Sequence, residues 1–423
     1  MSSLLPTISV VIPSHNRHQS LRRLLDKLGT QTFAAEKMQV IVAADGCTDA
    51  THSMLQNYAA PFLLHHIELA GEGAAAARNK GAALAKGPLL LFLDDDIDPS
   101  ENLIEAHVEA HQNENTVALG YLPFAVPPKA GFYQLSLRSW WEQKFQQMQN
   151  LRYRYCYEDL LSGNFSVSTQ LFKKVQGFDT QLQCREDYEL GLRLLQSGAD
   201  FVFCKNAWGY HRDEATNLHR SLKRKREEGK ADVQLWHKHP GLTTALQSAS
   251  QKGVYTFLQS KTTLFTVYFP GLTDLAAFCL EKTMPVLEAM RLRREWNTLN
   301  YNLHNYWYLR GLLTALGSRK KLNEYLHYRS GKTQTDEIEI DLKDGLKAAE
   351  EKLNRYRPAG VRLVFGKQPI GNIPANPGAE RLKGVHLRSI LAADFSAPLT
   401  KAIALEKLTQ LHSEHTKHNR NDH

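Results

Sequence analysis

Three consecutive carboxylates end an apolar run near residue 94 of the sequence. Residues 88–93 read Pro-Leu-Leu-Leu-Phe-Leu, and Asp94, Asp95 and Asp96 follow them directly. Adjacent carboxylates repel one another unless a positive charge lies among them. A divalent cation, Mg2+ or Mn2+, is the usual partner, because it takes oxygen ligands and bridges carboxylates to phosphate oxygens. The other interpretation is a solvated acidic helix start capped by Asp98, and the triplet alone does not decide between the two.

Strand-like and helix-like patterns alternate around this triplet. Short β-branched or apolar runs predict strands at residues 8–12, 38–43, 61–69 and 88–93. Leucines at helical spacing over residues 21–28 and an alanine-rich stretch at 74–85 predict helices between them. Such alternation is typical of a doubly wound α/β fold with a mostly parallel sheet. The carboxylate triplet would then lie at the C-terminal edge of the sheet, where open α/β sheets bind their ligands.

Composition and charge limit the class of protein and its partners. The 423 residues suffice for two or three domains, and the net charge of +8 suits anionic partners such as phosphorylated substrates or acidic lipids. No nucleic-acid-binding signature accompanies the basic residues, so we expect no nucleic acid partner. The five cysteines form no CxxC pair, which indicates a reducing compartment. Without a signal peptide or a spanning apolar run, we expect a cytoplasmic protein that can lie peripherally on the inner face of a membrane.

Five motifs in a fixed order resemble those of the family 2 glycosyltransferases, which have the GT-A fold. They are VIPSHNR at 11–17, VAADGCTD at 42–49, ARNKG at 77–81, FLDDDID at 92–98 and REDYELGLRLLQSG at 185–198. One motif alone is a weak signal, but five in order at domain-like spacing are a strong one. The sequence departs from the family pattern at Ala44, where an acidic residue is usual. The resemblance covers roughly half of the chain.

The resemblance implies a binding site for a nucleoside diphosphate sugar, most simply one linked to UDP. The residues that it assigns to this donor are Pro13, His15, Arg17, Asp45, Arg78, Asp94 and Asp95. Asp45 would accept a hydrogen bond from the base, and Pro13 and His15 would contact the base. Arg78 would approach the diphosphate or Asp45. The alternative for Asp45 is a plain Asp-Gly turn residue, and for Arg78 a surface helix residue.

The same resemblance implies the catalytic groups. Asp96 and His211 match positions that approach a divalent metal, which would stabilise the diphosphate leaving group, although a lone histidine is often structural. Asp187 would be the general base for an acceptor hydroxyl, with Glu186 beside it. The alternative for this acidic pair is a helix first turn that complements the helix dipole. Asn164 and Trp140 are the acceptor-binding candidates, although an aromatic pair such as Trp140–Trp141 is more often part of a core.

The resemblance thus implies a metal-dependent glycosyltransferase that moves a sugar from a nucleoside diphosphate to a hydroxyl acceptor. We expect inversion at the sugar carbon, and a role in polysaccharide or glycolipid synthesis with a glycan or lipid-linked glycan as acceptor. The alternative is a non-catalytic sugar-nucleotide-binding or scaffold protein. A nucleotidyltransferase would carry a glycine-rich phosphate loop after the first strand, and residues 11–17 lack one.

We expect three regions along the chain: a catalytic domain at 1–240, a helical region at 241–330 and, at 331–423, a connector helix with a small accessory module of unknown role. The basic run Lys223–Arg226 could be a lid over the diphosphate, a lipid contact or a solvated helix face. The amphipathic stretch 257–316 allows interfacial membrane contact, although a packed helical domain is the plainer interpretation.

Overall fold

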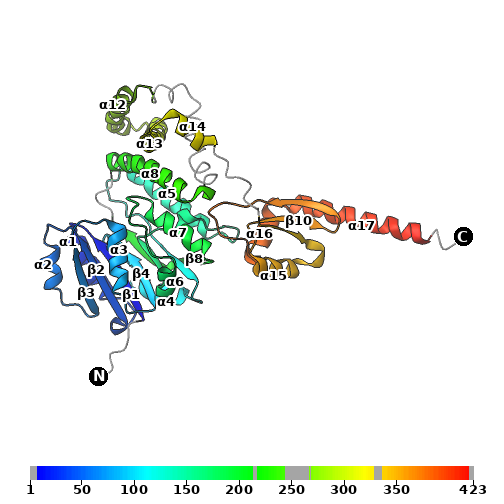
Figure 1. Ribbon diagram of the computed structural model, residues 1–423, viewed down its shortest axis with the longest axis horizontal. Coiled ribbons are helices and arrows are strands. Elements are labelled where there is room, and N and C mark those ends of the chain that lie inside the picture. The colour runs from blue at the N-terminus through cyan, green and yellow to red at the C-terminus, as the bar shows by residue number, and fades with distance from the viewer. Residues whose placement is uncertain (1–6, 213–216, 243–265, 267, 328–335, 419–423) are drawn as a thin grey trace. The chain divides into compact units, whose positions relative to one another are not determined.

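The protein forms two compact units in the computed structural model (Figure 1). The structure describes residues 7–212, 217–242, 266, 268–327 and 336–418. The first unit comprises residues 1–146 and 156–329, and the second comprises 147–155 and 330–423. The second unit thus joins a short segment near the middle of the chain to its C-terminal part. The described helices between residues 268 and 327 belong to the first unit, in which α13 (Arg293–Leu316) packs along α8 (Leu218–Lys238).

An eight-stranded sheet forms the centre of the first unit, in the order β3-β2-β1-β4-β7-β6-β8-β5. The strands are β1 (Ile8–Ser14), β2 (Met38–Asp45), β3 (Leu63–Leu69), β4 (Leu89–Leu93), β5 (Ile97–Pro99), β6 (Thr116–Tyr121), β7 (Asn164–Ser168) and β8 (Asp200–His211). The first four strands in this order are parallel, as are β6 and β8, whereas β7 and β5 run antiparallel to their neighbours. The sheet is therefore mostly parallel, as the alternating pattern predicted.

Helices flank the sheet and connect its strands. The shorter ones are α1 (His18–Leu28), α2 (Thr51–Gln56), α3 (Ala74–Ala83), α4 (Leu103–Ala110), α6 (Thr169–Lys174) and α7 (Glu186–Gln196). The predicted leucine stripe of α1 is fully buried and packs in one core with the apolar residues of β1, β2 and β4. Every residue of β4 is buried, as expected for an inner strand of a parallel sheet.

Two strand pairings determine which residues reach the edge of the sheet where the carboxylate triplet lies. β1 pairs with both β2 and β4, so the segments after all three strands emerge at one edge. At the far side, the long β8 ends in an antiparallel pairing with β5, which opposes His211 to Ile97. This pairing brings His211 beside the triplet, although more than 100 residues separate them in the sequence.

A helical layer completes the first unit beyond α8. It contains α12 (Pro270–Ala289), α13 and α14 (Arg319–His327), and Figure 1 shows α13 between α8 and α12. A Cβ on Gly311 of α13 would meet the backbone oxygen of Arg226 at 2.0 Å, so α8 and α13 approach closely only because glycine is present. The stretch expected to be amphipathic at 257–316 is thus a packed helical layer from residue 268 onward, whereas 257–265 and 267 lie outside the described residues.

None of the described helices is long and apolar enough to cross a membrane.

The second unit is a small α/β module. Its sheet, in the order β11-β10-β9, contains β9 (Glu337–Asp341), β10 (Gly360–Phe365) and β11 (Gln368–Ile373), with helices α15 (Leu346–Tyr356), α16 (Gly384–Asp394) and α17 (Ser396–His418). The connector helix expected within 331–423 is therefore not a separate element, because β9 and α15 at its place belong to the module itself. Residues 147–155, which follow from α5 (Phe132–Met148), belong to this unit because Arg154 donates hydrogen bonds to the backbone oxygens of Ala359, Pro374 and Glu380.

Candidate active site

The carboxylate triplet after β4 is bound by the segment that follows β1. The Ser14 hydroxyl donates to Asp95 Oδ2 at 2.7 Å, and the Arg17 guanidinium pairs with Asp95 Oδ1 at 3.2 Å and also with Asp96. Both carboxylates are buried. Burial raises the pKa of Asp95 to about 6, although Ser14 and Arg17 oppose the rise. Burial also raises the pKa of Asp96, but its contacts with His211 and Arg17 outweigh that effect and lower it overall.

Asp96 and His211 lie side by side at one end of the triplet. Asp96 Oδ1 is 3.3 Å from His211 Nε2, and this buried oxygen has no well-aligned hydrogen bond to any described residue. A carboxylate oxygen and an imidazole nitrogen are both donor types that Mn2+ accepts. Among the described residues, no group of three or more His, Cys, Asp and Glu is arranged to hold a metal ion. Asp96 and His211 alone would supply only two protein ligands to a metal.

Asp94, at the other end of the triplet, is linked to α7 through one buried arginine. Arg78, on α3, donates from Nη2 to Asp94 Oδ1 at 2.7 Å and from Nη1 to Glu186 Oε1 at 3.3 Å. Its guanidinium also lies over the ring of Phe178, 5.4 Å from the ring centre. Burial lowers the pKa of Arg78, but the carboxylates around it raise it overall, so the group stays charged. Arg78 therefore contacts Asp94 and Glu186, and not Asp45 as the sequence also allowed.

The acidic pair Glu186 and Asp187 opens α7. Arg185 precedes the pair in a left-handed backbone conformation with φ of 66°, and its side chain pairs with Glu228 and Asp232 of α8. Burial and the neighbouring Glu186 raise the pKa of Asp187 to about 6, against the charges of Arg224 and Arg78. A carboxylate with such a pKa is ionised at neutral pH and is basic enough to take a proton from a hydroxyl.

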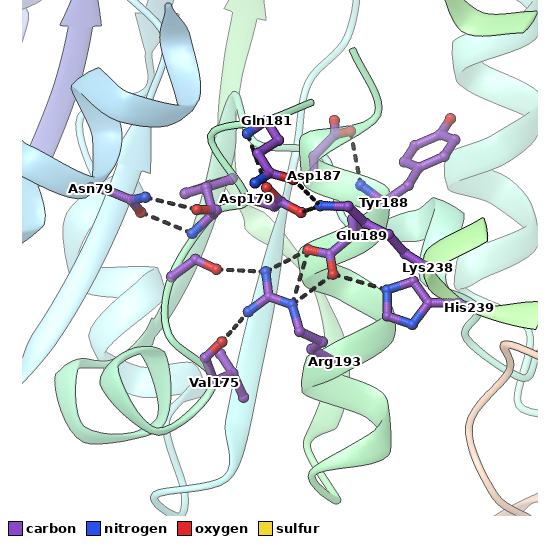
Figure 2. A network of polar contacts seen from close by, with 12 residues as sticks. Asn79, Val175, Asp179, Gln181, Asp187, Tyr188, Glu189, Arg193, Lys238 and His239 are labelled. Atoms are coloured by element: carbon purple, nitrogen blue, oxygen red, sulfur yellow. Dashed lines mark hydrogen bonds and ion pairs between the residues drawn. The ribbon is translucent and has the colours of Figure 1, made fainter. Parts of the chain in front are cut away.

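A network of polar contacts behind Asp187 holds α7 in place (Figure 2). Glu189 pairs with Arg193 one turn later and with His239 Nε2 at 3.0 Å. Arg193 also donates to the backbone oxygens of Val175 and Gly177. Because these contacts come from α7 itself, from the 175–177 turn and from the end of α8, they fix the helix that carries the acidic pair. The acidic residues of the first turn thus do more than complement the helix dipole, since Glu189 is a structural anchor.

Asp45, at the end of β2, is held by the backbone. Its Oδ1 accepts from the amides of Gly71 and Glu72 at 2.9 and 2.7 Å, and its Oδ2 accepts from Gly73 at 2.7 Å. His15 lies against its backbone oxygen, 2.5 Å from Nδ1. A carboxylate has about four acceptor positions, and three are filled here, so one position on Oδ2 is left for a ligand. Pro13 lies just before this site within β1.

The two acceptor candidates lie in different surroundings. Asn164 is 1% exposed, and its amide accepts from His107 Nε2 at 2.7 Å and donates to the Ala207 oxygen at 2.9 Å. The side chain is thus occupied by the interior, where it ties β7 to α4 and β8, and the acceptor-binding prediction is not supported by its position. Trp140, by contrast, is 50% exposed on α5, while its half-buried neighbour Trp141 stacks on the buried Phe145.

Comparison with known protein families agrees with this arrangement of strand-end motifs. Residues 9–175 match the family described as glycosyl transferase family 2. Residues 143–216 match the family described as N-terminal domain of galactosyltransferase. Residues 9–175 belong to glycosyl transferase family 2. The match contains four of the five motifs, and the fifth, at 185–198, lies within the second match.

The curated relatives that the chain matches come from bacteria and archaea. The chain is 30% identical over 239 residues to validoxylamine A glucosyltransferase of Streptomyces hygroscopicus subsp. limoneus, which covers 49% of this chain and 52% of the relative. It is 25% identical to glycosyltransferase AglE of Haloferax volcanii, covering 56% of this chain and 76% of AglE. The chain spans about half the length of the validoxylamine glucosyltransferases that it matches.

The fold of the family 2 domain is also that of a solved structure. The mannosyltransferase PcManGT from Pyrobaculum calidifontis, solved in complex with GDP-Man and Mn2+, superimposes with a TM-score of 0.50 at 15% identity. The superposition covers 74% of this chain and 88% of PcManGT. This likeness establishes the GT-A-type fold that the resemblance implied.

Two residues of the family 2 site were not predicted from the sequence. Ser14 contacts Asp95, and the positive charge of Arg224 on α8 acts on Asp187. Ser14 lies inside the quoted VIPSHNR motif, so its position at a strand end was a usable signal. Arg224 was seen only as one member of a basic run. Nothing in its spacing indicates which carboxylate it would meet, because that depends on how α8 lies against α7.

Proposed function

We propose that the protein is a metal-dependent glycosyltransferase that moves a sugar from a nucleoside diphosphate to a hydroxyl acceptor with inversion. The observation that carries this proposal is the bridge formed by Arg78, which links the donor-side carboxylate Asp94 to the acidic pair Glu186–Asp187. The bridge supports the proposal that a candidate base and the carboxylate triplet belong to one site. Transfer needs both, since the acceptor must lose a proton while the sugar carbon loses its phosphate.

Asp187 is the proposed general base. Its raised pKa makes it a stronger proton acceptor than an ordinary carboxylate, and at neutral pH it remains ionised. It would take the acceptor hydroxyl proton as the acceptor oxygen attacks the sugar carbon and the bond from that carbon to the diphosphate oxygen breaks. A single base on the side opposite the leaving group gives inversion. Glu186, which is held by Arg78, positions this first turn of α7.

Asp96 and His211 are the proposed residues that hold a divalent metal, Mg2+ or Mn2+. When bound, the metal supplies positive charge that stabilises the diphosphate as a leaving group. Arg17 places a further fixed cation beside Asp95 and Asp96. Asp94 would face the ribose or the sugar, as the resemblance implies, and Asp95 would also belong to the donor site. Pro13, His15 and the remaining acceptor position of Asp45 Oδ2 would contact the base, and an N–H donor such as that of uracil fits this oxygen.

The acceptor is proposed to be a glycan or a lipid-linked glycan, in the synthesis of a polysaccharide or glycolipid. Trp140, which the sequence predicted as an acceptor-binding residue, has an exposed ring that could stack on a sugar. The Lys144 ammonium lies over the Trp140 ring, 5.9 Å from its centre. A sugar would therefore have to share the ring with this cation.

A donor screen with site variants tests the proposal. The intact chain is incubated with UDP-, GDP- and dTDP-sugars, with and without Mn2+, and donor consumption and thermal shift are measured. One donor should raise the melting temperature by several degrees and be consumed. Asp187→Asn and Asp96→Asn should each lower turnover at least about a hundredfold, in line with loss of an acid–base group. Asp26→Asn, on the exposed surface of α1, is the matched control and should keep full turnover.

Three outcomes would contradict the proposal. Full turnover of either site variant would contradict the role assigned to that residue. Full turnover in EDTA would contradict the requirement for a metal. Donor binding without turnover for any acceptor would favour the alternative, a non-catalytic sugar-nucleotide-binding or scaffold protein.

A further inference from the structure

Helix α12 carries its acidic side chains on the face that packs against the protein and apolar side chains on its exposed face, the reverse of an ordinary surface helix. Its three carboxylates, Asp274, Glu281 and Glu288, recur every seven residues and point toward the rest of the first unit. Between them on the same face lie Ala277 and Met284, which are buried. The spacing 274, 277, 281, 284, 288 follows one face of a helix. The acidic residues of α12 thus lie on its inner face, where apolar residues would be expected.

Each inward carboxylate has a specific partner in the described structure. Asp274 accepts from Arg310 Nε at 2.8 Å and Nη2 at 2.9 Å, and Glu281 lies 2.8 Å from His219 Nδ1. Glu288 accepts from the backbone amide of Phe132 at 2.6 Å. These contacts come from α13, α8 and α5 and fix the rotation of α12 about its own axis. These contacts therefore determine which side chains of α12 face outward.

The outward face of α12 is apolar. Its centre is formed by Leu272, Leu275, Cys279, Val286 and Met290, which recur at intervals of three, four and seven residues. The four apolar side chains among them are between 57% and 63% exposed. Phe278 and Leu280 flank this row and are each 46% exposed. Exposed apolar side chains of this size, spread over a helix of about 30 Å and interrupted at Thr283, mark an interaction surface.

The charges around this face are positive. From Pro270 to Met290, which the structure describes in full, the outward face carries no carboxylate. Lys282 lies at its border, with its ammonium 5.0 Å from the centre of the Phe278 ring. Arg291, Arg293 and Arg294 are exposed at its C-terminal end, where Glu295 is the neighbouring exposed acid. An apolar face that carries no carboxylate and is bordered mostly by cations is complementary to an anionic lipid surface.

We propose that α12 binds an anionic lipid bilayer, with the apolar row of Leu272, Leu275, Cys279, Val286 and Met290 inserted between headgroups. Lys282 and the three arginines contact the lipid phosphates. This surface belongs to the same compact unit as the candidate active site, so binding places that unit on the membrane. Burial of apolar side chains supplies the affinity, and the basic residues make it depend on lipid charge and on salt. The proposal does not rest on the transfer reaction.

Vesicle co-sedimentation of the full chain, without any donor, tests the proposal. We expect binding to vesicles of phosphatidylcholine with phosphatidylglycerol, and at least about tenfold weaker binding to phosphatidylcholine alone or in high salt. Leu275→Glu with Val286→Glu should lower binding more than tenfold. Lys282→Glu with Arg294→Glu should lower binding to the anionic vesicles while leaving binding to neutral vesicles unchanged. Leu408→Glu, at a leucine 62% exposed on α17, is the matched control and should bind as the unaltered chain does.

Further measurements distinguish lipid binding from other interactions of the outward face of α12. Circular dichroism and thermal melting establish that each variant is folded, and sedimentation velocity gives the oligomeric state. Failure of the unaltered chain to bind anionic vesicles would overturn the proposal. So would unchanged binding of Leu275→Glu with Val286→Glu. A dimer that this double variant converts to a monomer, without vesicle binding, would assign the face to a second copy of the chain.

Discussion

The Glu186 carboxylate lies 3.3 Å from the Arg78 guanidinium, whose other end pairs with Asp94 at 2.7 Å. Arg78 is only 4% exposed, so a charge on α3 holds together the end of β4 and the start of α7 from within the protein. The two halves of the proposed reaction, donor handling and proton abstraction, are thus coupled through one side chain. A fixed distance between them is what a transfer between two bound molecules requires.

Arg78→Ala should cost both stability and activity. Removing the guanidinium leaves two carboxylates without their shared cation, and breaking a buried ion pair in this way costs about 3 kcal/mol. Urea denaturation measures the loss. Arg78→Lys keeps the charge but not the forked geometry, so it should recover part of the stability and little of the turnover. If Arg78→Ala unfolded at the same urea concentration as the unaltered chain, the bridge would have no structural role.

Asp187→Asn should raise stability at neutral pH while it removes activity. The folded pKa of about 6 lies above the ordinary value of 3.8, so between these values the folded chain binds more protons than the unfolded chain does. Its ionisation therefore lowers the stability of the folded chain as pH rises toward 6, and this cost remains above pH 6. Asparagine avoids it, so the variant should gain about 3 kcal/mol at pH 8, the gain shrinking toward pH 4. Paired denaturation curves at the two pH values check this, and a gain of equal size at both would contradict it.

Arg224 should set the pH at which the proposed base becomes active. The rate constant kcat/KM should rise with pH as Asp187 ionises near pH 6. The charge of Arg224 lowers the pKa of Asp187, so Arg224→Gln should move this rise to higher pH. Lys223→Gln, at an exposed position one residue earlier on α8, is the matched control and should leave the profile unmoved. An identical profile for Arg224→Gln would show that another group is being titrated.

The predicted parts of the site lie where buried strands end. Val10 and Ile12 of β1, like Leu91 of β4, form continuous apolar runs, so the strands could be recognised and their polar ends expected at one edge. The acidic pair at the start of α7 followed from its motif. In each of these places a local sequence pattern is sufficient to predict the position of the side chain, because the strand or helix that carries it determines its direction.

The unpredicted parts depend on pairings between distant segments. β5 has only three residues and no readable period, so periodicity does not show its pairing with β8. The position of His211 beside Asp96 could be expected only from the family resemblance. Asn164 looked like a ligand-binding residue, because nothing in the sequence shows that His107 fills its hydrogen bonds inside the protein. The inward direction of Glu281 depends on His219, which lies 62 residues away. Each of these positions is set by tertiary contacts that sequence periodicity does not record.

His211→Ala should weaken the response of the protein to Mn2+. If Asp96 Oδ1 and His211 Nε2 together hold the metal, losing the imidazole should raise the half-saturating Mn2+ concentration at least about tenfold, with turnover partly restored at high Mn2+. Mn2+ titrations of turnover, and of Mn2+ binding by electron paramagnetic resonance, measure the effect independently. His52→Ala on α2, where the imidazole pairs with Glu68, is the matched control and should leave both titrations unchanged. Removing a metal ligand must weaken Mn2+ binding. Equal half-saturating Mn2+ concentrations for His211→Ala and the unaltered chain would therefore mean that His211 is only a structural partner of Asp96.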